Sequence, residues 1–167
     1  MRALVVLLLL VGCLPPDRPQ PPASPLAIIE ASTDLDGRVV GRSNARATIV
    51  VLMASWCGHC RAQLEQIAQL RDRHPFARVL GVNYKGHEEY DSRGNAQQLR
   101  AYVGEHVPWL RVVPAGEQLF GALGRPPFVP AVWVYSARGE LVEFYDRRER
   151  APPTAEELEA LLARLGA

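Results

Sequence analysis

Residues 48–60 read TIVVLMASWCGHC, and this stretch joins a short apolar segment to two cysteines that are separated by two residues. The segment 48–53 is rich in β-branched residues, as expected of a buried parallel strand. From 61 to 73, apolar side chains then recur near helical spacing. The stretch therefore predicts a strand, a turn and a helix that meet at Cys57 and Cys60.

The placement of the two thiols predicts redox chemistry. At a helix N-terminus the free N–H groups and the helix dipole favour negative charge, so we expect the pKa of the Cys57 thiol to be lowered. Cys60 lies one turn further in, where it can resolve a mixed disulfide by attacking Cys57. We assign Cys57 and Cys60 as catalytic residues, and their neighbours Trp56 and His59 as residues that tune the pKa of Cys57. A protonated or hydrogen-bonding His59 would favour the thiolate, whereas a solvent-facing His59 would have little effect.

A CxxC pair can also belong to a metal site or to a permanent disulfide. A zinc site needs four ligands, but the chain has no second CxxC, and His74, His87 and His106 are not spaced to pair naturally with the cysteines. A permanent disulfide that closes so short a loop constrains the unfolded chain very little. A Cu(I) site built from both thiolates and a histidine, and a thiol peroxidase, remain as alternatives. We predict a redox pair and no metal site.

The N-terminal segment has the layout of a secretory signal. Residues 1–12 contain one basic residue, Arg2, before an apolar run that is too short to span a membrane comfortably. The run ends in Leu10-Val11-Gly12-Cys13, which resembles the bacterial lipoprotein signal. This resemblance implies that Cys13 becomes the lipidated first residue of the mature chain and attaches it to a membrane. An ordinary signal peptide and an uncleaved anchor are the alternatives.

Composition divides the rest of the chain into a tether and one domain. Prolines at 15, 16, 19, 21, 22 and 25 favour an extended spacer, so we predict a tether over 13–30 and a single folded domain over 31–167. The formal net charge is +1, with arginines and acidic residues interspersed, which argues against a nucleic-acid partner. The predicted location is the bacterial cell envelope, facing the periplasm or the cell exterior, where disulfide exchange can take place.

Periodicity predicts alternating strands and helices, which indicates an α/β layer fold. Asn95 can cap one helix, and Thr154 with Glu157 has the pattern of a capping box that opens the last helix. The expected elements are an edge strand or turn near 38–41, strands at 48–53, 78–84, 109–113, 131–135 and 140–145, and helices at 58–73, 95–106, 117–123 and from 154 to 165. Residues 85–94 are expected to form a polar loop.

Taken together, residues 35–165 resemble the thioredoxin superfamily, and within it the membrane-tethered TlpA and ResA-like thiol-disulfide oxidoreductases. The resemblance rests on the strand before Trp56-Cys57-Gly58-His59-Cys60 and on Phe128-Val129-Pro130-Ala131, which matches the cis-proline segment of the family. It implies a thioredoxin-like fold, with a central mixed sheet flanked by helices and the helix at 95–106 inserted between the two halves. It also implies that Val129 and Pro130 bind substrate, that the partners are protein clients and an upstream thiol donor, and that no cofactor is needed.

Two departures from the family pattern leave parts of the mechanism open. Thioredoxin has a buried Asp six positions before its first active-site cysteine, and Val51 stands there in this chain. ResA-like proteins instead place a Glu shortly after the next strand, whereas Glu88 and Glu89 lie a few residues late. The base that assists Cys60 is therefore not assigned. The resemblance favours reduction of clients, although the Gly-His dipeptide matches protein disulfide isomerase better, so oxidation or isomerisation of clients stays open.

Overall fold

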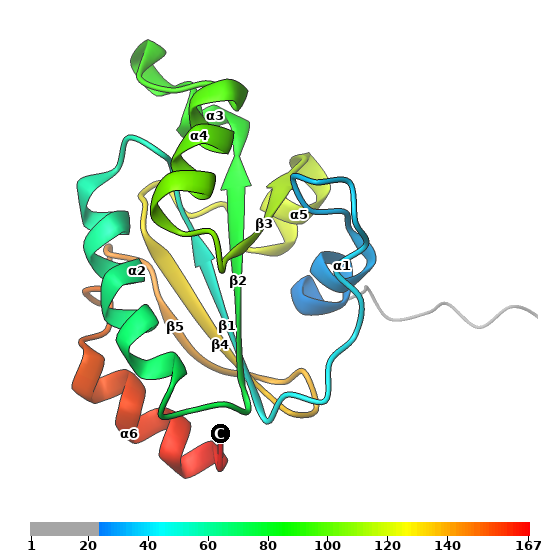
Figure 1. Cartoon of the computed structure of the whole chain (residues 1–167), viewed down its shortest axis with the longest axis vertical. Helices are drawn as coiled ribbons and strands as arrows, with labels where there is room; N and C mark the ends of the chain where they lie inside the picture. The colour runs from blue at the N-terminus through cyan, green and yellow to red at the C-terminus, as the bar shows by residue number, and fades with distance from the viewer. Residues whose placement is uncertain (1–23) are drawn as a thin grey trace, which may run out of the picture.

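The computed structural model describes residues 24–167, which form one sheet with helices on both faces (Figure 1). The five strands are arranged in the order β3-β2-β1-β4-β5. Strands β1, β2 and β3 run parallel, while β4 is antiparallel to β1 and β5 is antiparallel to β4, so the predicted mixed sheet is confirmed. In chain order the elements are α1 (Pro25–Ala31), β1 (Ala47–Leu52), α2 (Gly58–Arg71), β2 (Ala77–Tyr84), α3 (Lys85–Glu88), η1 (Tyr90–Ser92), α4 (Ala96–His106), β3 (Arg111–Ala115), α5 (Glu117–Ala122), β4 (Ala131–Ser136), β5 (Leu141–Tyr145) and α6 (Ala155–Leu165).

The helices divide between the two faces of the sheet. Helices α2 and α4 connect successive parallel strands, and right-handed crossovers in one direction along a sheet place both on the same face. The Arg61 guanidinium of α2 accordingly lies 3.3 Å from the His106 ring of α4. Helix α6 packs against α2, whereas α1 contacts α5 on the other face (Figure 1). Strand β1 lies between these layers, and all six of its residues are buried.

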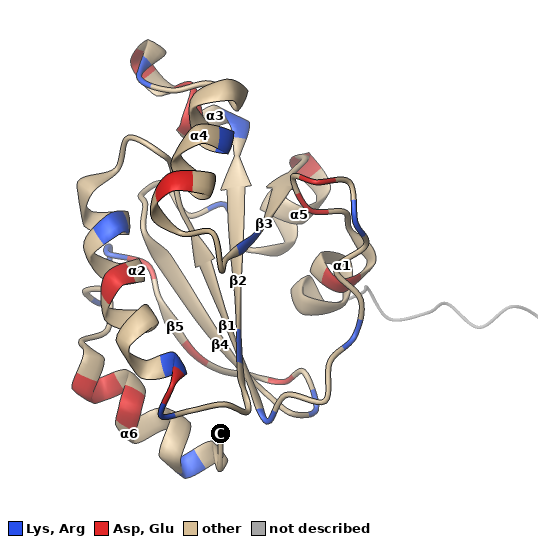
Figure 2. Ribbon diagram, in the orientation of Figure 1, with Lys and Arg blue, Asp and Glu red and all other residues tan. Residues whose placement is uncertain are grey.

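Most charged residues belong to the helices and loops rather than to the strands. Figure 2 shows Lys and Arg interspersed with Asp and Glu on the helices and loops, while β1 and β4 carry no charged residue. The capping box predicted for α6 is confirmed, because the Thr154 side chain accepts from the Glu157 N–H and the Glu157 carboxylate accepts from the Thr154 N–H. Asn95 caps α4 as predicted, accepting from the N–H groups of Gln97 and Gln98.

The first helix corrects the predicted tether. Residues 25–30 were assigned to the tether, but they form most of α1, in which Leu26 and Ile29 are buried in the core. The Ser24 side chain accepts a hydrogen bond from the Ala27 N–H at 3.2 Å, and Pro25 occupies the first helical position, where its missing N–H is harmless. Cys13, the predicted signal at 1–12 and the remainder of the tether lie outside the described residues.

A second correction concerns residues 85–94, which were expected to form a polar loop. They contain the short helices α3 and η1, and one side chain of this segment, Glu88, turns inward and is only 2% exposed. The edge segment expected near 38–41 is reduced to an isolated antiparallel bridge between Thr33 and Val39.

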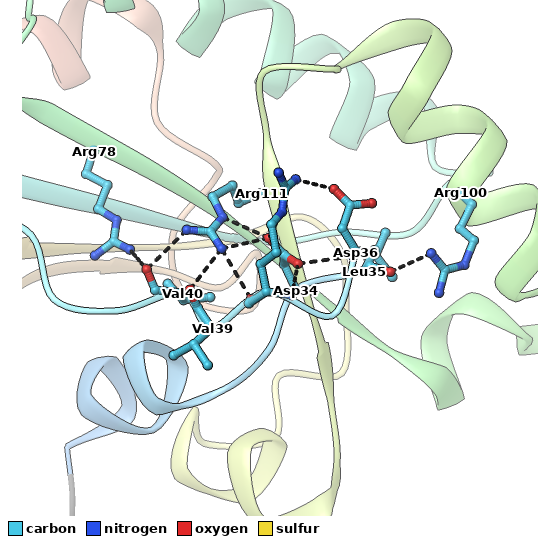
Figure 3. Close-up of polar contacts among 9 residues, drawn as sticks. Asp34, Leu35, Asp36, Val39, Val40, Arg78, Arg100 and Arg111 are labelled. Carbon is cyan, nitrogen blue, oxygen red and sulfur yellow. Dashed lines mark hydrogen bonds and ion pairs between the residues drawn. The ribbon is translucent and has the colours of Figure 1, made fainter.

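An ionic network fastens the segment after α1 to the edge of the sheet (Figure 3). The Asp34 carboxylate, 6% exposed, accepts from the N–H groups of Asp36 and Arg38 and lies 2.7 Å from the guanidinium of Arg111 on β3. Burial raises the pKa of Asp34, but the Arg38 N–H and the Arg111 guanidinium outweigh it and hold the pKa below the ordinary value. The Leu35 N–H donates to the Val112 carbonyl at 2.9 Å. The segment therefore covers the outer edge of β3.

Candidate active site

The redox pair lies at the junction between β1 and α2, as the sequence predicts. Cys57 is the N-cap residue of α2, and its sulfur accepts a hydrogen bond from the Cys60 N–H at 3.1 Å. The two residues form a disulfide with their Cα atoms 5.2 Å apart. Cys57 is 6% exposed and Cys60 is fully buried beneath it. The sulfur of Cys57 is thus the one that a large partner can reach, and it lies at the positive end of a 14-residue helix.

Trp56 is fixed beside the pair by hydrogen bonds to the segment after β2. Its indole N–H faces the carbonyl oxygens of Glu88 at 2.9 Å and His87 at 3.1 Å. The Arg93 guanidinium lies over its ring, 5.1 Å from the centroid. These contacts hold α3 and the following turn against the loop that carries Cys57.

Glu88 belongs to the site, although its sequence position alone does not assign it a role. Its carboxylate accepts from the Ser55 N–H at 2.9 Å, from the Ser55 hydroxyl and from the Asn83 side-chain amide at 2.8 Å. The Asn83 amide also donates to the carbonyl of Met53 at 3.0 Å. Glu88 therefore binds the loop just before Cys57 to the end of β2. The available signal was Asn83, a polar residue at the buried end of an apolar strand.

Val129 and Pro130 lie opposite the redox pair, and the peptide bond between them is cis, as the resemblance implied. The Val129 carbonyl oxygen is 3.8 Å from the Cys57 sulfur. The same oxygen accepts a hydrogen bond from the Arg147 guanidinium at 3.3 Å. In sequence, Arg147 belongs to the charged run 147–150, and nothing local distinguishes it from the other arginines of that run.

An open groove of about 500 Å³ lies over Cys57. Its lining combines Trp56, His59 and Arg93 with Phe128, Val129 and Arg147. Phe128 and Tyr90 project into solvent at its rim, with 53% and 61% of their surface exposed. The groove thus offers apolar surface next to the reachable sulfur.

Two histidines line the same groove in different environments. His59 is exposed, and no hydrogen bond joins its ring to Cys57 among the described residues, so its predicted effect on the thiol stays a prediction. His87 packs edge-on against Tyr84 and Phe120, and burial lowers the pKa of its imidazole, partly opposed by the backbone of Pro127. This lowered pKa favours the neutral form of the imidazole.

Residues 24–167 contain no group of three or more His, Cys, Asp or Glu side chains arranged to hold a metal ion. None of the helices in this part of the chain has the length and apolarity that a bilayer crossing requires.

Comparison with known proteins supports the fold at low sequence identity. No model of a known protein family and no curated protein sequence matches this chain. Among solved structures, it is similar to a secreted Mycobacterium tuberculosis disulfide oxidoreductase homologous to E. coli DsbE, with 17% identity, 80% of this chain and 93% of that chain covered, and a TM-score of 0.61. A thioredoxin-like protein from Aeropyrum pernix gives 14% identity, coverage of 80% of this chain and 87% of that chain, and a TM-score of 0.66. The exposed lipoprotein thioredoxin of Streptococcus pneumoniae gives 18% identity, coverage of 80% of this chain and 96% of that chain, and a TM-score of 0.59. The chain therefore has a thioredoxin-like fold.

Proposed function

We propose that this protein is a TlpA/ResA-like thiol-disulfide oxidoreductase of the cell envelope that reduces disulfides in partner proteins. The observation that carries the proposal is the arrangement of the two sulfurs, one reachable at the start of α2 and one buried within reach of it. Solved structures with the same fold include a secreted disulfide oxidoreductase and a lipoprotein thioredoxin, which is consistent with this chemistry and location.

The reaction follows from the positions of the two cysteines. In the reduced protein the Cys57 thiolate attacks one sulfur of a client disulfide, so that a mixed disulfide forms and one client thiolate leaves. The Cys60 thiolate then attacks the Cys57 sulfur, which releases the second client thiolate. Two electrons pass to the client, and the protein is left with the Cys57–Cys60 disulfide, the state seen here. An upstream thiol donor reduces that disulfide and completes the cycle.

The surroundings of Cys57 favour its role as attacker. The Cys60 N–H points at its sulfur from 3.1 Å, and such a donor stabilises a thiolate more than a thiol. Val129 and Pro130 provide the adjacent backbone against which an extended client segment would lie. A client that uses the Val129 carbonyl must share it with, or take it from, Arg147.

Trapping of intermediates tests the assignment of the two cysteines. Because Cys60 resolves the mixed disulfide, Cys60→Ser should accumulate clients covalently linked to Cys57, visible as bands that disappear on reduction. Cys57→Ser should accumulate none. The opposite pattern would reverse the roles, and the absence of turnover of insulin with dithiothreitol by the unmodified protein would end the proposal.

The direction of electron flow is tested by equilibrium with glutathione. A reductase should have a potential near that of thioredoxin, about −270 mV, whereas oxidation or isomerisation of clients calls for a value nearer −180 mV or above. The amount of copper bound by the reduced protein tests the alternative of a Cu(I) site. Tight copper binding without turnover of disulfides would favour that alternative.

We further propose that lipid on Cys13 anchors the protein, facing the periplasm or the cell exterior. Expression of the full chain in a bacterial host should place it in the membrane fraction, and Cys13→Ser should release it or leave it unprocessed. Mass spectrometry of the mature N-terminus distinguishes a diacylated cysteine from an ordinary cleaved end.

A further inference from the structure

The groove over Cys57 has an uneven distribution of charge. Its lining includes the arginines Arg93 and Arg147, and no aspartate or glutamate belongs to that lining among the residues the structure describes. Asp91 and Glu149 are close to the two arginines in sequence but lie outside the lining. The whole chain has a formal net charge of only +1, so this basic character is local.

Arg147 differs from the other arginines of its run. Arg148 lies 2.7 Å from the Asp146 carboxylate and Arg150 lies 2.8 Å from that of Glu143. Within residues 24–167, Arg147 has no carboxylate within ion-pair distance, and its guanidinium instead donates to the Val129 carbonyl. Contacts of 3.3 Å and 3.8 Å through that oxygen connect the guanidinium to the Cys57 sulfur.

Arg93 also lines the groove and also has no ion pair in the described part of the chain. Its guanidinium lies over the rings of Trp56, at 5.1 Å, and Tyr90, at 5.9 Å. Stacking on an aromatic face leaves the edge of a guanidinium, with its N–H donors, free to bind a carboxylate. The exposed rings of Phe128 and Tyr90 add apolar surface beside these donors.

We propose that the groove selects clients whose reacting cysteine is flanked by apolar and acidic residues. The inference rests on the proposed function and names its substrate class. Because an extended chain rises about 3.3 Å per residue, a carboxylate one or two positions from the client cysteine can reach Arg147 or Arg93 while the sulfur meets Cys57. A carboxylate would give Arg147 a stronger acceptor than the Val129 carbonyl, which would free that carbonyl for the client backbone.

The test uses three peptides that differ only in charge. Each is a disulfide-linked dimer of one short peptide with a central cysteine and an apolar neighbour, and the positions two residues to either side are both Glu, both Gln or both Lys. Rates of reduction by the reduced full chain are followed by tryptophan fluorescence. Each rate is divided by the rate at which dithiothreitol reduces the same peptide, which removes differences in the intrinsic reactivity of the peptides.

We expect the normalised rates to follow the order Glu, Gln, Lys, with the Glu peptide roughly tenfold or more above the Lys peptide at low salt. The ratio should fall towards one at about 1 M salt, where screening is short-ranged. In the double variant Arg93→Gln with Arg147→Gln the ratio should drop below about twofold. Arg138→Gln, which removes an exposed arginine of the β4–β5 turn, is the matched control and should keep the original ratio.

Two results would overturn the inference. One is equal normalised rates for the three peptides, and the other is a preference for Glu that survives the double variant. Reduction of the uncharged 2-hydroxyethyl disulfide separates this failure from a failure of the proposed function. If the unmodified protein reduces that compound but shows no charge preference, only the inference falls, and if it reduces neither compound nor peptide, the proposed function falls with it.

Discussion

The carboxylate of Glu88 hydrogen bonds to both the backbone N–H and the hydroxyl of Ser55, a residue 33 positions earlier in the chain. Ser55 is two residues before Cys57, so this contact sets the loop that delivers the reachable sulfur. The carboxylate is buried, and its other partner is the amide of Asn83 at the end of β2. The position of the active site therefore depends on a buried carboxyl group whose hydrogen-bond partners are Ser55 and Asn83.

Removal of that carboxylate should destabilise the protein strongly. Glu88→Ala removes the acceptor of the Ser55 N–H and one of the two acceptors of the Asn83 amide, so we expect a loss of about 2–4 kcal/mol in the free energy of unfolding, measured with urea. The exposed neighbour offers the control, because Glu89→Ala should change stability by less than about 1 kcal/mol. Equal effects of the two variants would mean that the Glu88 network contributes little.

A pair of glycines provides a second test of the same contact. A Cβ added at Gly94 would lie 2.8 Å from the Glu88 carbonyl oxygen, so Gly94→Ala should destabilise the protein and displace Glu88. A Cβ at Gly104, inside α4, meets nothing within 4 Å. Gly104→Ala should therefore stabilise the protein by about 0.5–1 kcal/mol through helix propensity. Thermal unfolding of both variants measures the contrast, and a shift of the same sign in both would contradict it.

The Asp34 network should make stability sensitive to acid. Because the folded-state pKa of Asp34 is below its unfolded value of about 3.9, its contribution is fully present above that value and is lost as the pH falls through the folded pKa. Urea midpoints between pH 6 and pH 2 should therefore decline more steeply for the unmodified protein than for Asp34→Asn. Parallel declines would show that other carboxylates govern the acid sensitivity.

The two reduced thiols should differ in reactivity. Iodoacetamide should modify Cys57 before Cys60, since Cys60 is fully buried. The rate at Cys57 should rise with a midpoint below the value of about 8.5 that is typical of a free thiol, because the helix N-terminus and the Cys60 N–H favour the thiolate. Mass spectrometry after timed alkylation, with glutathione as the reference thiol, gives both results. Initial labelling of Cys60 would contradict the assignment.

The sequence predicts those elements of the fold whose local patterns agree with the tertiary structure. The apolar run of β1 and the helical spacing of α2 place Cys57 and Cys60 correctly, and the mixed sheet follows from the resemblance. Helix α1 is not predicted, because its start, Ser24-Pro25, follows a proline-rich stretch and resembles a continuation of the tether. The same two residues can also open a helix.

Long-range contacts account for what the sequence did not reveal. Nothing local in the polar segment 85–94 indicates that Glu88 is buried, since its partner Ser55 lies on another loop. Arg147 likewise resembles its charged neighbours in sequence. Only the tertiary structure distinguishes it, because it lies near the Val129 carbonyl and has no carboxylate partner among residues 24–167. Both residues acquire their roles from groups that lie far away along the chain.

The segment that covers β3 also determines how copies of this protein can meet. With the Leu35 N–H bonded to Val112, that side of the sheet offers no regular ladder to a neighbouring chain. At the opposite border, β5 carries Glu143 in an ion pair with Arg150, and a charge there discourages a second copy from adding its own strand. Each border of the sheet thus carries a feature that disfavours pairing with the strand of another chain.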